Sequence, residues 1–210
     1  MLKVVTITSL KGGTSKSTLC LNLFYYLQQE GRNIGIIDAD RQGSLLELTE
    51  GREEFPLITR DDFKKWSDIK KFNEVDLLVV DSAPRMETNE TRDMLNNTDL
   101  ALIPCKASQF DVNALQHTLD IIEEIQEDKK DLRAAIVITQ GYHSSSIVDD
   151  LRKSINEYGH PVLATEMKYR VDYSHSLPYE KGILSSANQK AKEEIKGIAI
   201  EIQNLLRYVG

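Results

Sequence analysis

Short apolar runs alternate with longer amphipathic stretches along the chain, and this alternation predicts the order of its secondary structure. A short apolar run bounded by turn residues is typical of a buried strand, whereas apolar residues recurring every three or four positions indicate a helix. Strands and helices in alternation predict a doubly wound α/β fold, a mostly parallel sheet with helices on both faces. No linker or repeat interrupts the pattern, so we expect a single domain over 1–210. The predicted strands are 2–8, 33–38, 76–81, 100–104, 134–139 and 162–165, and the predicted helices are 19–27, 43–49, 61–72, 88–97, 112–127, 146–158 and 189–206.

The segment between the first predicted strand and helix has the features of a phosphate-binding loop. It contains Gly12 and Gly13 and ends with Lys16, Ser17 and Thr18. Glycines allow backbone N–H groups to curl around phosphate oxygens, and the positive end of the following helix favours the same anion. In such a loop Lys16 would reach the β- and γ-phosphates, and the Ser17 hydroxyl would hold Mg²⁺. The alternative is a glycine-containing turn with incidental lysines.

The loop departs from the common P-loop pattern, G-x-x-x-x-G-K-[ST], because Leu10 and Ser15 occupy its two glycine positions. The arrangement Lys11-Gly12-Gly13-x-x-Lys16-Ser17 instead resembles the deviant Walker A motif of ParA/MinD-type ATPases. The resemblance implies a P-loop NTPase fold with ATP and Mg²⁺ as cofactors and slow ATP hydrolysis. The family usually has glycine at the position of Ser15, so a small residue is kept but the freedom of φ is lost. By this resemblance the nucleotide-binding residues of the loop are Lys11, Gly12, Gly13, Thr14, Ser15, Lys16, Ser17 and Thr18.

Aspartates follow two other predicted strands. Asp38 and Asp40 lie at and just beyond the end of strand 33–38, and Asp81 closes the apolar strand 76–81. In a doubly wound sheet, ligands bind beyond the carboxyl ends of the strands, so these side chains should face the phosphate loop. Asp81 resembles a Walker B aspartate and would hold Mg²⁺ through water. An ordinary acid at the start of a loop is the alternative.

The segment after strand 33–38 resembles the first switch of the same family. Asp38-x-Asp40-x-Gln42 is similar to the family's D-x-D-P-Q, with Arg41 in place of proline. The resemblance implies that Asp40 is catalytic and orients the attacking water, while Asp38 supports the metal shell. A helix N-cap role is the alternative for either aspartate. The metal-binding residues implied in this way are Ser17, Asp38 and Asp81.

Three later stretches also resemble the family. Residues 81–85, ending in Arg85, are similar to its second switch, and residues 99–104, with Ser108 and Asp111 beyond them, are similar to the stretch after that switch. The positions where relatives contact the base correspond to Thr139, Gln140, Met167 and Lys168.

Lys11 suggests how two subunits would meet. Phosphoryl transfer is commonly assisted by a second cation beside the P-loop lysine. In the ParA/MinD family, the lysine that matches Lys11 reaches across a two-fold interface to the partner's nucleotide. The resemblance therefore implies that Lys11 and Lys16 are both catalytic and that ATP holds a homodimer together. A solvated loop lysine is the alternative.

The charge is unevenly distributed. A net charge of −7 argues against an obvious nucleic-acid binder. However, residues 1–150 contain 17 basic and 26 acidic side chains, whereas residues 151–210 contain 9 and 7. A basic surface is therefore expected in the C-terminal third. The candidate DNA-binding residues are Arg152, Lys153, Lys168, Arg170, Lys190, Lys192 and Lys196.

The resemblance is to the short ParA type, because the loop begins near residue 9 and we expect no DNA-binding extension before it. It implies nonspecific DNA binding by the ATP dimer and a ParB-like or centromere-binding adaptor that stimulates hydrolysis. The protein would segregate or position DNA or another cargo in the cytoplasm, associated with the nucleoid. Cys20 and Cys105 are typical of buried thiols in a reducing compartment.

Two alternative functions stay open. One is a MinD-like positioning ATPase, but Glu193, Glu194 and Glu201 interrupt the polar face that a basic membrane anchor needs, so no membrane partner is expected. The other is a small ligase resembling dethiobiotin synthetase, against which the Lys-Gly-Gly motif argues. An electron carrier resembling nitrogenase reductase is excluded, because no cysteine lies near the second switch to ligate a cluster.

Overall fold

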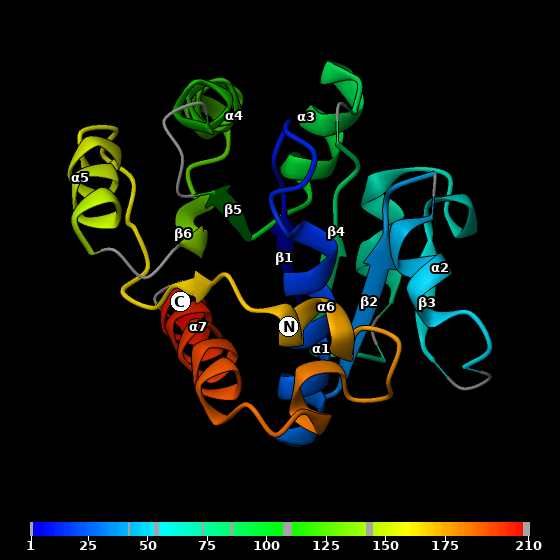
Figure 1. Cartoon of the computed structure of the whole chain (residues 1–210). Helices are drawn as coiled ribbons and strands as arrows, with labels where there is room; N and C mark the ends of the chain where they lie inside the picture. Colours follow the sequence, from blue (N-terminus) through cyan, green and yellow to red (C-terminus); the bar gives the residue numbers. More distant parts are fainter. Residues whose placement is uncertain are drawn as a thin grey trace.

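A computed structural model shows one sheet of seven parallel strands in the order β3-β2-β4-β1-β5-β6-β7, with β1 in the middle (Figure 1). The structure describes residues 2–41, 43–52, 55–72, 74–84, 86–106, 111–141 and 145–207, without the side chains of 111–113 and 145–147. The predicted doubly wound α/β class is confirmed. The strands are β1 Lys3–Ile7, β2 Ile34–Asp38, β3 Leu57–Thr59, β4 Leu77–Asp81, β5 Leu100–Lys106, β6 Arg133–Gly141 and β7 Met167–Lys168.

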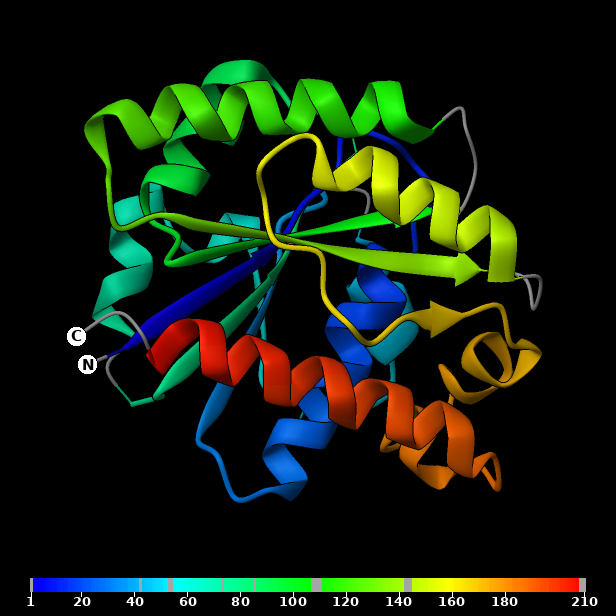
Figure 2. The same ribbon diagram turned by 90° about the vertical axis from the view of Figure 1, so that its left-hand side faces the viewer.

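Helices cover both faces of this sheet, as the edge-on view in Figure 2 shows. On one face α1, α6 and α7 pack against side chains such as Val5 and Val79, and on the other α3, α4 and α5 pack against Val4 and Val80. The side chains of neighbouring residues in one strand thus point to opposite faces of the sheet, because side chains alternate along a strand. The helices are α1 Lys16–Gln29, α2 Ser44–Thr49, α3 Thr88–Asn96, α4 Asp111–Asp128, α5 Ser145–Asn156, α6 Val171–Ser176 and α7 Gln189–Arg207, with 3₁₀ turns η1 Arg60–Asp62, η2 Trp66–Lys71 and η3 Gly182–Ser185.

The strand order fixes where a ligand can enter. From β1 the chain passes through α1 to β2 on one side, and from β4 it crosses to β5 on the other side of β1. This reversal leaves a crevice at the carboxyl end of β1, the usual ligand position in doubly wound sheets. The loop that contains Gly12 and Gly13 begins at that end. None of the described helices has both the length and the hydropathy needed to cross a membrane.

Two of the predicted elements are wrong in kind or position. The helix expected at 61–72 is replaced by η1 and η2, and the buried Phe63, Trp66 and Ile69 recur every third residue, the period of a 3₁₀ turn. The strand expected at 162–165 is reduced to a single bridge between Val162 and Ile136, and β7 follows it instead. The reason is that the N–H groups of residues 164 and 165 donate to the carboxylate of Glu201 at 2.7 and 2.8 Å, not to a neighbouring strand.

Candidate nucleotide-binding site

The loop between β1 and α1 is shaped to receive an anion. Gly13 has a φ of 74°, and a Cβ added at Gly12 or Gly13 would meet no atom within 4 Å, so this side of the loop is open. Ser15 stands at the N-cap of α1, but its side chain makes no capping hydrogen bond. The first N–H groups of α1 are left to a ligand, and they carry the positive end of the helix dipole.

Ser15 adopts the left-handed conformation that glycine usually supplies, with φ 70° and ψ 24°. This conformation costs an L-residue roughly 1–2 kcal/mol. The side chain of Gln140, at the end of β6, offsets it: its Nε2 donates to Ser15 Oγ at 2.7 Å and to the Gly13 carbonyl at 3.0 Å. Thr139 Oγ1 donates to the Thr14 carbonyl at 3.1 Å. The end of β6 therefore braces the loop, a role that the sequence did not indicate for Thr139 and Gln140.

Lys16 is the buried cation of the loop. Its side chain is 6% exposed, and its Nζ donates to the Lys11 carbonyl at 3.3 Å. Burial lowers the pKa of the Lys16 ammonium, while the nearby carboxylates of Asp81 and Asp40 oppose that shift. Lys11 itself is half-buried at the start of the loop. The structure thus brings the predicted Lys16 and the two predicted aspartates into one electrostatic cluster.

Asp81 is the most unusual group in this cluster. It is 1% exposed, and neither carboxylate oxygen has a hydrogen-bond partner in the described part of the chain; the same holds for Ser82 Oγ. Burial raises the pKa of Asp81 to about 7, with Asp38 adding to the rise and the Ser17 hydroxyl and Lys16 opposing it. A buried polar group without a partner is costly, so Asp81 fits a ligand that supplies positive charge.

Asp38 and Asp40 differ in what they contact. Asp38 pairs in register with Asp81 across β2 and β4, and its oxygens accept N–H groups from Asp40 at 3.0 Å, Leu45 at 2.8 Å and Leu46 at 3.1 Å. The contacts from Leu45 and Leu46 tie Asp38 to the first turn of α2, whose N-cap residue is Gly43, and all three contacts oppose the rise that burial gives the pKa of Asp38. The Asp40 carboxylate accepts the Ser44 hydroxyl at 3.1 Å and faces the loop.

Two cavities of about 230 Å³ each adjoin the loop and share Gly13, Ser15 and Thr18. The first is lined by both glycines, the helix start, Asp40 and Ser82. The second lies against Gln140, Met167 and Lys168, three of the four residues predicted to contact a base, and against α6; the fourth, Thr139, does not line it. Sequence analysis missed Tyr173 and Ser174 in this wall, because α6 is too short to show a periodic pattern. The first cavity suits phosphates and a cation, and the second suits an attached base.

No described group of three His, Cys, Asp or Glu side chains is arranged to hold a metal alone. Mg²⁺ does not need one, since it keeps several waters and uses one or two carboxylates together with phosphate oxygens. The buried carboxylate of Asp81, close to the Ser17 hydroxyl that lowers its pKa, is a donor set of that kind.

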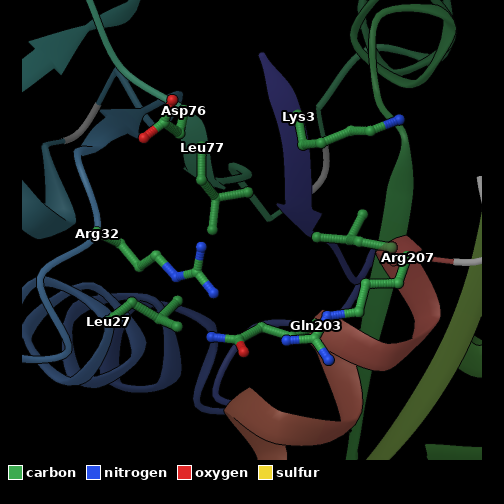
Figure 3. Close-up of a pocket in the computed structure, with 8 residues that line it drawn as sticks. Lys3, Leu27, Arg32, Asp76, Leu77, Gln203 and Arg207 are labelled. Carbon is green, nitrogen blue, oxygen red and sulfur yellow. The ribbon is translucent and has the colours of Figure 1, made fainter. Parts of the chain in front are cut away.

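Another cavity of about 200 Å³ lies at the opposite, amino end of the strands (Figure 3). Arg32, Gln203 and Arg207 extend toward it over Leu27 and Leu77. It shares no residue with the loop or with the two cavities beside it. It is therefore separate from the nucleotide site.

The candidate DNA-binding residues separate into two groups. The guanidinium groups of Arg152 and Arg170 face Glu166 at 3.2 Å and Glu194 at 2.6 Å, so both make ion pairs within the chain. The exposed lysines are Lys190, Lys196 and Lys153, whose Nζ lies 3.5 Å from Asp150 Oδ1, while Lys168 and Lys192 are half-buried. Four other residues of the predicted motifs cannot be placed: Gln42, Arg85 and Ser108 lie outside the described residues, as does the side chain of Asp111.

Fold and site together define a P-loop nucleotide-binding protein. The chain belongs to the family described as the CobQ/CobB/MinD/ParA nucleotide binding domain, whose model matches residues 5–183. A relative from Halothiobacillus neapolitanus, maintenance of carboxysome distribution protein A, is 28% identical over 206 residues, covering 94% of this chain and 95% of the relative.

Two solved structures are similar in fold. Apo McdA from Cyanthece has a TM-score of 0.75 at 18% identity and covers 96% of this chain and 100% of its own. Cobyrinic acid a,c-diamide synthase from Mycobacterium smegmatis, with bound ADP and magnesium, has the same TM-score at 16% identity and covers 97% and 95%. Since McdA and a synthase match equally well, the fold alone does not choose between the functions of such proteins.

The raised pKa of Asp81 predicts a pH-dependent stability without nucleotide. Folding takes up a proton between the ordinary pKa of 3.8 and the folded value of about 7, so stability is greatest below that window and falls as pH rises through it. In EDTA at about pH 8, Asp81→Asn should be more stable than the parent by about 2–4 kcal/mol, and the difference should shrink toward about pH 5. Denaturant unfolding measures this. Asp76→Asn, at an exposed position before β4, is the control; equal pH profiles for Asp81→Asn and the parent would contradict the assignment.

The brace from β6 predicts coupling between Gln140 and Ser15. Gln140→Leu removes the donor that holds the left-handed Ser15, so ATP affinity should fall by roughly tenfold. In a Ser15→Gly background the same change should matter less, because glycine adopts this φ without help. Calorimetric titration of the four proteins forms a double-mutant cycle. Additive effects of the two substitutions would show that the brace does not support Ser15.

Proposed function

We propose that this chain is a Mg²⁺-dependent ATPase of the ParA type, which dimerises around ATP and positions DNA or another cargo. The observation that carries the proposal is the unpartnered Asp81 carboxylate beside a loop with lysines at 11 and 16. When bound, Mg²⁺·ATP supplies the phosphoryl group and the cation that neutralises its charge. The donor set around Asp81 fits that ligand.

The residues of the site would divide the work as follows. The N–H groups of the loop and Lys16 would bind the phosphates, and Ser17 and Asp81 would hold Mg²⁺. Asp38 would act indirectly, because its contacts fix the start of α2, which follows the segment that carries Asp40. Asp40 would orient the attacking water, since its carboxylate lines the same cavity as the loop.

Lys11 would act in the partner's site. It starts the loop, and its carbonyl oxygen accepts Lys16 Nζ, so the backbone at Lys11 is tied to the site of its own chain. The proposed dimer places the Lys11 side chain on the γ-phosphate of the other subunit, where a second cation favours transfer. Hydrolysis would remove that bridging charge and release the dimer.

The relative from Halothiobacillus supports a positioning role over the ligase alternative. The relative from Halothiobacillus is named for carboxysome distribution and matches almost the whole chain. We infer that the cargo is a DNA molecule or a protein compartment, and that an adaptor protein of the ParB kind stimulates hydrolysis. The ATP dimer would bind nonspecific DNA of the nucleoid, which serves as the track.

The dimer can be tested by mixing two inactive variants. Lys11→Ala should lack the cation that acts in trans, and Asp40→Ala should lack the residue that acts in cis, so each alone should have less than about a tenth of the parental ATPase rate. In a mixed dimer, the site on the Lys11→Ala subunit receives Lys11 from its partner and keeps its own Asp40. An equal mixture should therefore regain up to about a quarter of the parental rate. A mixture no faster than its components would contradict action in trans, and Lys11→Ala with the parental rate would contradict any catalytic role for Lys11.

If the C-terminal lysines bind DNA, reversing their charge should weaken DNA binding more than reversing lysines elsewhere. Reversing the exposed Lys153, Lys190 and Lys196 to Glu should weaken DNA binding with ATP by at least about tenfold and lower the slope of log affinity against log salt. The control reverses Lys64, Lys70 and Lys130, which are exposed elsewhere, and changes the net charge equally. Fluorescence anisotropy with a random duplex, alongside sizing for ATP-dependent dimers, measures both. Equal loss in the two triple variants would show a net-charge effect and no localised DNA surface.

A further inference from the structure

A single carboxylate on α7 accepts hydrogen bonds from three residues in the wall of the second cavity. Glu194 accepts the N–H of Lys168 at 3.2 Å, Nε and Nη2 of Arg170 at 3.0 and 2.6 Å, and the hydroxyl of Tyr173 at 2.8 Å. All three partners line the second cavity, whereas Glu194 does not. Glu194 lies about twenty residues further along the chain and belongs to another element.

These contacts are buried, which makes them strong and specific. The side chains of Arg170 and Glu194 are 13% and 11% exposed, and Tyr173 is 3% exposed. Charge-assisted hydrogen bonds are stronger than neutral ones, and removing one partner of a buried pair leaves the other charge uncompensated. The pKa of Arg170 is raised by its hydrogen bond to Glu194, and that of Tyr173 is raised by burial and by the same carboxylate.

Other contacts among the described residues each hold only part of this wall. β7 has only two residues, and its pairing with β6 has an irregularity between Thr139 and Gly141. Apolar burial anchors the segment at Met167 and Tyr173, which are each 3% exposed, but not at Tyr169 and Val171, which are 50% and 52% exposed. Asp172 ties the start of α6 to Asn188 at 2.8 Å, but from outside the second cavity. Glu194 joins Lys168, Arg170 and Tyr173 to one another and, together with the burial of Tyr173, sets their place beside the loop.

We propose that Glu194 is a positioning residue for the nucleotide base. This role of Glu194 rests on the proposed function, since it assumes that ATP places its phosphates in the first cavity and its base in the second. Glu194 does not touch the base; it holds the backbone at Lys168 and the ring of Tyr173 in the places that receive it. A change at Glu194 thus affects the base end of the ligand and leaves the phosphate end unchanged.

The same helix supplies a matched control. Glu201 also lies on α7 and also accepts backbone N–H groups from the segment before β7, those of residues 164 and 165. Neither of these two residues lines the second cavity. Glu194→Gln and Glu201→Gln thus remove similar carboxylates from one helix, and only the first loosens the cavity wall.

The test measures dissociation constants for ATP and for inorganic tripolyphosphate, both with Mg²⁺, together with thermal unfolding. Glu194→Gln should weaken ATP binding by about tenfold or more and change tripolyphosphate binding by less than about twofold. Glu194→Asp, which keeps the charge, should recover part of the loss. Glu201→Gln should lower the melting temperature and leave both dissociation constants unchanged. If Glu194→Gln does not fold, Tyr173→Phe decides, because it removes only one hydroxyl and should weaken ATP binding selectively.

The inference is overturned if Glu194→Gln, or Tyr173→Phe in its place, binds ATP as tightly as the parent. Equal loss of ATP and tripolyphosphate also overturns it, because that result shows a general loss of structure. A parent that binds neither ligand overturns the proposed function, and the inference with it. If the parent binds both ligands and Glu194→Gln binds them as tightly, only the role of Glu194 is rejected. The proposed function is not contradicted by that result.

Discussion

The buried carboxylate of Asp81 is the constraint on which the site depends. A carboxylate without hydrogen-bond partners is tolerated only when something compensates it, and here the compensation available within the described chain is proximity to Lys16 and Ser17. Lys16 is buried in turn, with a lowered pKa. Each of the two groups is therefore poorly satisfied without a ligand. Mg²⁺ with a triphosphate brings a cation to Asp81 and anions to Lys16 at once, so the same residues that weaken the empty site would favour the filled one.

The rest of the fold holds this arrangement in place. Asp38 and Asp81 end adjacent parallel strands in register, so both reach the crevice beside β1. The Asp38 carboxylate accepts hydrogen bonds from two N–H groups at the start of α2. These bonds fix the loop that carries Asp40. Gln140 and Thr139 hold the carbonyls of the phosphate loop from the other side. Side chains from β6 thus hold the phosphate loop, and the carboxylates of β2 and β4 lie near its Lys16.

Much of this was predictable because it depends on local patterns. The central strands are continuous apolar runs, and Lys11, Gly12, Gly13 and Lys16 stand at fixed spacing between a strand and a helix. The sequence could not show contacts that depend on distant residues. The contacts of Asp38 with α2, the brace from Gln140 to Ser15 and the ion pairs of Arg152 and Arg170 all join segments through side-chain geometry. Short or edge elements, such as β3, β7 and α6, have too few residues for a periodic signal, and the 3₁₀ turns around Trp66 have a period that resembles that of a helix.

The central claim is that Asp81 and the loop together form a site for Mg²⁺·ATP. Calorimetric titration of the protein with ATP, once in excess Mg²⁺ and once in EDTA, tests it most directly. The account predicts one ATP per chain in Mg²⁺ and an affinity at least about tenfold weaker in EDTA, because without the cation the triphosphate approaches an uncompensated carboxylate. Equal affinity in Mg²⁺ and EDTA, or no binding in either, would contradict the account.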